Sequence, residues 1–162
     1  MMSLDLFLSA LALVACLACG LVAGVFFAFS AFVMKALARI APSEGIAAMQ
    51  SINVVVLNVW FLSLFLGTAA ICVVALVVSL LRWSESGMAW MLAGGLLYLA
   101  GTVLVTIACN VPRNEALAKI APSEPAAANS WTGYVAGWTA WNHVRTAAAL
   151  AAAACFGAVL AR

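Results

Sequence analysis

Four long apolar runs separated by short polar segments organise the chain. The runs cover residues 6–34, 54–81, 88–111 and 144–160, and the charged residues fall almost entirely between them. A helix needs about 20 apolar residues to cross the hydrocarbon core of a bilayer. The pattern therefore predicts an all-α fold, a four-transmembrane-helix bundle. It would consist of two helical hairpins, about 4–81 and about 88–161, within one integral membrane domain over residues 1–162.

Composition agrees with a membrane-embedded chain. Of the 162 residues, 68% are hydrophobic and only 7% are charged, whereas soluble domains carry about 25% charged residues. The net charge of +2 is too small for a nucleic-acid-binding surface. The lipid bilayer is therefore the first expected partner, nucleic acid is not expected as one, and a homo-oligomer is left open.

Two connecting segments have nearly the same sequence. Residues 36–44 match residues 116–124 at eight of nine positions, with Arg39 replaced by Lys119, at an offset of 80 residues. The offset is about half the chain, so we expect an internal duplication of the hairpin, with local convergence on one kind of turn as the alternative. In each copy the proline would stop one helix and Ser43 or Ser123 would cap the next.

The distribution of positive charge suggests an orientation. The segments that join the two helices of each hairpin carry Lys35, Arg39, Arg113 and Lys119, and the opposite end carries Arg82 and Arg162. The positive-inside rule counts such residues. We therefore expect a multi-pass protein of a bacterial inner membrane, with the turn loops 35–52 and 113–137 in the cytoplasm.

Small residues indicate where the helices approach one another. Glycine and alanine let transmembrane helices pack closely. On the third helix Gly94 and Gly101 would serve this purpose. On the first helix we expect a ridge of small residues at i, i+4 spacing: Cys16, Gly20, Gly24 and Ala28.

The cysteines all lie inside apolar runs. This placement favours small buried hydrophobes. Cys16 and Cys19 are one helical turn apart, but no second pair supports redox chemistry. A redox role for this pair is left open.

Polar residues cluster at the membrane boundary on the side of the two turns. Counting along each helix places them near one depth, although three different helices supply them: Gln50, Asn53, Asn110, Arg113, Asn114, Asn142, His143 and Arg145. Polar groups at this depth are costly unless they are paired or face a wet cavity. Such a layer indicates either a ligand or catalytic site or a structural hydrogen-bond network.

The fourth helix presents two faces within this layer. At about 100° per residue, Trp138, Trp141, Asn142 and Arg145 share a stripe, whereas His143 lies about 160° from Arg145. A regular helix cannot aim both at one small pocket. The tryptophans would either pack or stack on a substrate.

A metal site is not expected. His143 is the only histidine, and zinc needs three or four ligands. The five carboxylates are all outside the apolar runs.

Several motifs resemble those of a known family. Residues 24–29, the pair Gln50 and Asn53, the Asn-x-Pro-x-Asn element at 110–114 and the Trp-Asn-His-x-Arg-Thr element at 141–146 are similar to the anthrone oxygenase-like family of small four-helix membrane proteins. The resemblance covers nearly the whole chain.

The resemblance implies an oxidoreductase, a monooxygenase that oxidises an anthrone-like, phenolic or quinol polycyclic substrate with O₂ as co-substrate and without a cofactor. His143 would be the catalytic base, and Asn142, Asn110 or Asn114 would stabilise the enolate oxygen. Arg145 would stabilise negative charge on the substrate. The substrate-binding residues would be Gln50, Asn53, Asn110, Asn114, Trp138 and Trp141. The alternative is a non-enzymatic membrane protein that binds or passes a small apolar molecule.

Overall fold

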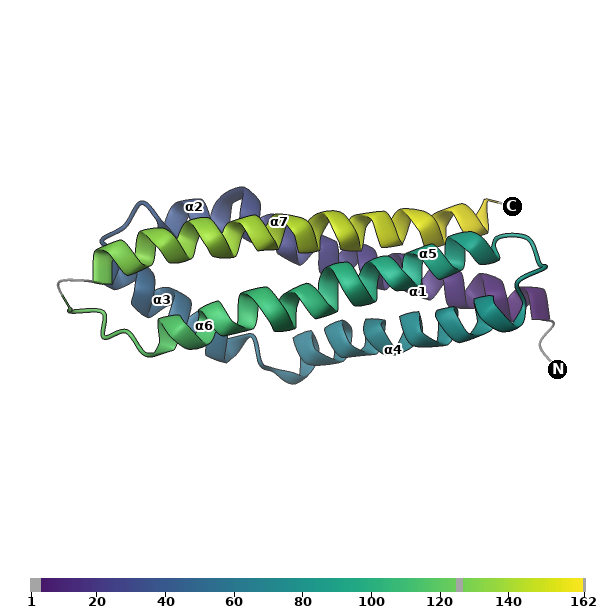
Figure 1. Cartoon of the computed structure of the whole chain (residues 1–162), viewed down its shortest axis with the longest axis horizontal. Coiled ribbons are helices and arrows are strands. Elements are labelled where there is room, and N and C mark those ends of the chain that lie inside the picture. The colour runs from purple at the N-terminus through teal and green to yellow at the C-terminus, as the bar shows by residue number, and fades with distance from the viewer. Residues whose placement is uncertain (1–3, 125–126, 162) are drawn as a thin grey trace.

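The computed structural model describes residues 4–124 and 127–161, and four antiparallel helical rods make up its fold (Figure 1). The first rod consists of α1 (Leu4–Ala28), the π-helical η1 (Phe29–Val33) and α2 (Met34–Leu37). The second consists of α3 (Pro42–Val55) and α4 (Val59–Leu81). The third consists of α5 (Met88–Tyr98), the π-helical η2 (Leu99–Leu104) and η3 (Thr106–Asn110), and α6 (Val111–Ala118). The fourth is α7 (Ala127–Leu160).

The rods form a closed ring. α1 packs against α4 and α7, and α5 packs against the same two helices from the other side. Figure 1 shows both hairpin turns at one end of the bundle and both termini at the other. This arrangement is the predicted four-helix bundle.

All four rods contain a helix long and apolar enough to cross a membrane, and the protein is an integral membrane protein. α4 has 23 residues, which at 1.5 Å per residue makes it about 34 Å long, close to the thickness of the hydrocarbon core. Exposed tryptophans stand at both ends of this helix, Trp60 at one and Trp83 at the other. Tryptophan is enriched at membrane interfaces, so these residues mark the two boundaries.

The second rod differs from the continuous run expected over 54–81. It breaks at residues 56–58, between α3 and α4. Asn58 holds the break, because its side chain donates to the carbonyl of Val55 (2.8 Å) and accepts from the amide of Phe61 (3.0 Å). A short amide side chain thus replaces the helical hydrogen bonds that its neighbours would otherwise make.

The two similar segments agree in structure only in part. Both end a helix and turn, over residues 38–41 in the first and 119–121 in the second. Pro42 then starts α3, while Pro122 stays in the turn. The expected cap by Ser43 is wrong, because Ala41 is the N-cap residue and makes no side-chain bond. Proline suits the first helical position, since its missing N–H would be unpaired there.

The expected turn loops 35–52 and 113–137 are largely helical. They include α3 to residue 52, most of α6 and the first eleven residues of the described α7. α7 has 34 residues and a length of about 51 Å. It therefore extends well past a hydrocarbon core of about 30 Å.

The structure confirms the expected close packing at two glycines of the third rod but not at two glycines of the first. A Cβ at Gly101 would overlap that of Ala148 in α7, and one at Gly94 would meet the ring of Phe156 at 3.0 Å. By contrast, no atom lies within 4 Å of a Cβ placed at Gly20 or Gly24. The expected ridge on the first helix is wrong there, because α1 turns a different stripe inward: Ala12, Ala15, Cys19, Val22, Ala23 and Phe26.

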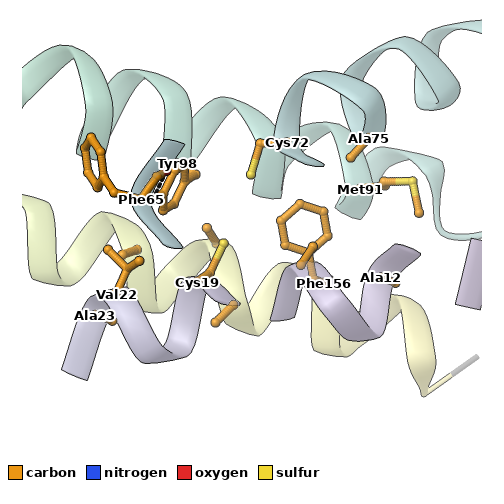
Figure 2. Close-up of a cluster of buried hydrophobic side chains, with 14 of the residues drawn as sticks. Ala12, Cys19, Val22, Ala23, Phe65, Cys72, Ala75, Met91, Tyr98 and Phe156 are labelled. Atoms are coloured by element: carbon orange, nitrogen blue, oxygen red, sulfur yellow. Dashed lines mark hydrogen bonds between the residues drawn. The ribbon is translucent and has the colours of Figure 1, made fainter. Parts of the chain in front are cut away.

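The membrane core is apolar and continuous around Phe156 (Figure 2). Tyr98 is fully buried in it and donates its hydroxyl to the carbonyl of Phe65 (3.0 Å). Cys19 and Cys72 project into the same core (Figure 2), and all five cysteines are free thiols. A second apolar cluster, around Trp131, Tyr134 and Trp138, fills the turn end of the bundle.

Candidate functional site

Asn142 of α7 is the polar centre of the bundle. Its side chain is fully buried, and its amide nitrogen donates to the carbonyl of Phe26 (2.7 Å) and to the hydroxyl of Ser30 (2.6 Å). The amide oxygen accepts from Nη2 of Arg145 (2.6 Å). Asn142 thus links the first rod to the fourth and orients the guanidinium one turn away.

Arg145 is the buried cation of this site. Only 4% of its surface is exposed, and Nη1 donates to the hydroxyl of Thr106 (3.2 Å). The guanidinium carbon lies 4.2 Å from the ring centroid of Phe26 and 5.1 Å from that of Trp138. Aromatic faces attract cations, so the two rings hold the guanidinium in place.

Within residues 4–124 and 127–161, no carboxylate forms an ion pair with this cation. The ion pair found in the described residues joins Arg82 to Glu85, far from Arg145 in the chain. Nε of Arg145 is buried and has no hydrogen-bond partner in the described part of the protein. A buried charge without a counter-ion is costly, so in the described structure Arg145 is held by the two aromatic rings and by its hydrogen bonds to Thr106 and Asn142.

Three π-helical segments meet at this level. η1 supplies Ser30, η2 supplies Thr102 and η3 supplies Thr106, and each segment packs against α7. Thr102 donates to the carbonyl of Arg145 (3.4 Å), and Thr106 donates to the carbonyl of Thr102 (2.7 Å). π-helical turns occur mostly as single-turn bulges within α-helices and are frequent at functional sites. Here they contribute to the wall around Arg145.

A cavity of about 540 Å³ opens beside Arg145, between the two apolar clusters. Its volume falls in the range of small-molecule sites, about 300–1,000 Å³. Its walls are mainly apolar, and the polar and charged side chains on them are Gln50, Asn53, Thr106, Asn114, Glu115 and Arg145. The aromatic side chains on its walls are Phe26, Phe29, Phe61, Phe65 and Trp138.

The structure brings several of the expected substrate-binding residues to the cavity. Gln50, Asn53, Asn114 and Trp138 all line it. Gln50 also donates to the carbonyls of Leu117 and Ile120 (2.9 Å each), so it closes the end of α6. Asn114 accepts from the hydroxyl of Tyr134 (2.9 Å).

Other expected residues lie elsewhere. Asn110 is buried and donates to the carbonyl of Trp138 (3.2 Å) without lining the cavity. Arg113 donates to the carbonyl of Cys109 on its own helix. Trp141 is 37% exposed and also lies outside the cavity.

His143 faces away from the site. Its side chain is exposed, and it is absent from the cavity wall. This position follows from the angle of about 160° between His143 and Arg145 on a regular helix. The structure therefore joins Asn142 to Arg145 and separates both from the histidine.

Residues 4–124 and 127–161 contain no group of three or more His, Cys, Asp or Glu side chains that could hold a metal ion. The carboxylate of Glu115 lies on the cavity wall, while the hydrogen-bonding groups around Arg145 are amides and hydroxyls together with its own guanidinium. Such groups bind and orient an oxyanion through N–H and O–H donors.

The sequence interpretation missed Ser30, Phe61 and Thr106 as parts of the site. A signal existed for two of them. Ser30 is an isolated polar residue in the first apolar run, and Thr106 follows Thr102 at i+4 in the third. Neither residue could be assigned to Arg145 without knowing how the helices rotate against each other.

Comparison with known proteins identifies the family. The sequence profile described as anthrone oxygenase matches residues 58–155. This segment includes Phe61, Thr106, Trp138, Asn142 and Arg145, while Phe26 and Ser30 precede it. Searches among curated proteins and among solved structures gave no significant match. Since the profile covers more than half of the chain, including most of the site, the protein belongs to the anthrone oxygenase family.

Proposed function

We propose that the protein is an oxygenase that converts an anthrone-like phenolic polycycle and O₂ into a quinone and water in the cavity beside Arg145. The observation that carries this proposal is the buried guanidinium without a counter-ion, next to an apolar cavity. The family membership supports the reaction class. No cofactor is part of the proposal.

The chemistry needs an acidified C–H bond. Removing a proton from the CH₂ group of an anthrone gives an anion whose charge is spread over the fused rings and the carbonyl oxygen. Arg145 would stabilise this enolate oxygen through its N–H groups, which act strongly because water is largely excluded from the site. Phe26, Phe61 and Trp138 would contact the ring system.

The anion then supplies the electrons. It adds O₂ at the deprotonated carbon to give a peroxide, which takes up a proton and loses water to leave a second carbonyl. One oxygen atom of O₂ enters the quinone and the other leaves as water, so one anthrone and one O₂ balance one quinone and one H₂O.

The first proton needs an acceptor near the cavity. Glu115 is the one carboxylate on the cavity wall, and it is exposed at the turn end. We assign this role to Glu115 in preference to His143, which lies outside the cavity. With Arg145 stabilising the product anion, a carboxylate is a sufficient base.

Oxygen uptake by the purified protein tests the proposal. With an anthrone in detergent we expect substrate-dependent O₂ consumption and one quinone per O₂, measured with an electrode and by absorbance. Arg145→Gln should lower kcat/KM by about 100-fold or more, the effect of removing an oxyanion-stabilising donor. Arg39→Gln is the matched control, because it removes an exposed cation at the turn end.

Two results would contradict the proposal. One is the absence of O₂ uptake across a panel of anthrones and phenols when the same compounds bind to the protein, which would favour a non-enzymatic binder. The other is an equal effect of Arg145→Gln and Arg39→Gln on turnover.

A further inference from the structure

The cavity beside Arg145 is open along one side of the bundle. Its inner wall includes Phe26, Trp138 and Arg145, which are all buried. Its outer edge is formed by residues of the second and third rods, and those are exposed: Leu57 (67%), Leu66 (56%) and Ile107 (60%). The first and fourth rods contribute no exposed side chain to the cavity wall. The opening therefore lies between the second and third rods.

Helix packing explains why this side is open. At the turn end α3 packs against α6, and at the other end α4 packs against α5 and η2. The break at residues 56–58 lies between these two contacts and contributes Val56 and Leu57 to the cavity. Figure 1 shows the second rod changing direction at this break, beside the third rod. We call this opening, edged by Leu57, Leu66, Ile107 and Val111, the side window.

The side window extends from the membrane boundary, near Leu57, toward the bilayer interior at Leu66. Trp60 is 85% exposed and marks the membrane boundary on α4, and Leu66 lies about 9 Å further along the helix toward the opposite boundary. These four edge residues are apolar, and Glu115, the exposed carboxylate of the cavity wall, lies nearer the turn end on α6. Hydrocarbon solvates exposed apolar side chains, and water does not. An apolar edge is therefore typical of an opening toward lipid.

We propose that the side window admits an amphipathic acid from the bilayer, a molecule with an apolar body and one ionisable oxygen, whose anionic oxygen pairs with Arg145. The buried cation, which has no ion-pair partner in the described residues, selects the anion, and the apolar edge selects a molecule dissolved in lipid. An anthrone in its enol form belongs to this class. Only the identification of the acid as an anthrone rests on the proposed function. Entry through the side window and pairing with Arg145 require no oxidation.

Photolabelling in vesicles tests the side window without any turnover. The protein is reconstituted with a long-chain fatty acid that carries a diazirine in its chain, irradiated without O₂, digested and mapped by mass spectrometry. We expect labels on cavity residues such as Phe61 and Val103. Arg145→Gln should lose most of these labels, and the corresponding fatty alcohol should give few of them, because neither pairs a carboxylate with the guanidinium.

Narrowing the opening is the second arm. In the double variant Leu66→Trp and Ile107→Trp, cavity labelling should fall several-fold. The matched control is Leu80→Trp. Leu80 is an exposed leucine on α4, the helix of Leu66, and it lies outside the cavity. Labelling of the outer surface should remain the same in all variants and reports that each is folded and embedded.

The outcomes separate this proposal from the oxygenase. Cavity labels that depend on Arg145 and on the window residues support the proposal, even in a protein that consumes no O₂ with anthrones. Labels confined to the outer surface would overturn it. Cavity labels of equal strength in the double variant and in Leu80→Trp would overturn the window, and equal labelling by acid and alcohol would overturn the anion pairing.

Discussion

The side-chain oxygen of Asn142 lies 2.6 Å from Nη2 of Arg145, one turn further along α7. Because the same amide donates to Phe26 and Ser30 in the first rod, the position of the cation depends on the contact between the first and fourth rods. Asn142 is neutral, so it orients the guanidinium without cancelling its charge. Arg145 therefore keeps its positive charge inside an apolar wall.

This arrangement predicts an unusual response to Asn142→Asp. The aspartate keeps an oxygen for Arg145 but supplies the missing counter-ion. We expect weaker anion binding and a lower kcat/KM than in Asn142→Ala, which loses the oxygen altogether but leaves the charge. Labelling by the diazirine acid and anthrone turnover measure the two effects. Binding by Asn142→Asp as strong as in the unchanged protein would show that charge does not drive recognition.

Asn142→Ala should also reduce stability. It leaves the buried carbonyl of Phe26 and the Nη2 donor of Arg145 without their partner. Leaving such groups unsatisfied costs about 1–3 kcal/mol each. The melting temperature in detergent should fall clearly, and an unchanged value would mean that water or a shifted side chain replaces the amide.

His143→Gln should retain turnover close to that of the unchanged protein. The imidazole is exposed and does not line the cavity, so in this chain it cannot reach a substrate held by Arg145. Initial rates of O₂ uptake, compared with those of Glu115→Gln, check this expectation. Loss of most activity in His143→Gln alone would restore the histidine as the base that the sequence predicts.

Alanine substitutions should distinguish a glycine that lies at a close helix contact from one that does not. Gly101→Ala places a methyl group against Ala148, and overpacking of this kind costs about 1–3 kcal/mol. Gly24→Ala meets no neighbour and should be neutral or stabilising by about 0.5–1 kcal/mol, since alanine favours the helix. Thermal unfolding of the two variants under one condition provides the measurement. Similar shifts in both would contradict the packing seen between η2 and α7.

Several parts of the site could be found from the sequence. The polar layer placed Gln50, Asn53, Asn114 and Arg145 together, and all four line the cavity. The argument was that residues at matching distances from a membrane boundary lie at matching depths. The angular argument also separated Arg145 from His143, since both positions lie on one regular helix. These arguments need only helix geometry and bilayer thickness.

Other parts could not be found in this way. The π-helical segments add residues to a turn and rotate everything that follows, so facing directions inferred from 3.6 residues per turn fail beyond them. Gly20 and Gly24 were assigned to packing for a different reason, because several stripes of α1 are small and apolar and the sequence does not show which one turns inward. The break at Asn58 lies inside an apolar run, where hydropathy gives no sign of it.

The length and spacing of the apolar runs are enough to decide the number of helices, their antiparallel order and their place in a membrane, because burying apolar side chains in lipid is a property of each segment alone. The rotation of each helix about its axis is decided only when the four pack together. That rotation joins Asn142, Arg145, Ser30 and Thr106, turns His143 outward and leaves one side of the cavity open. Those outcomes depend on contacts between distant segments, in which a small shift of one helix changes which side chains meet.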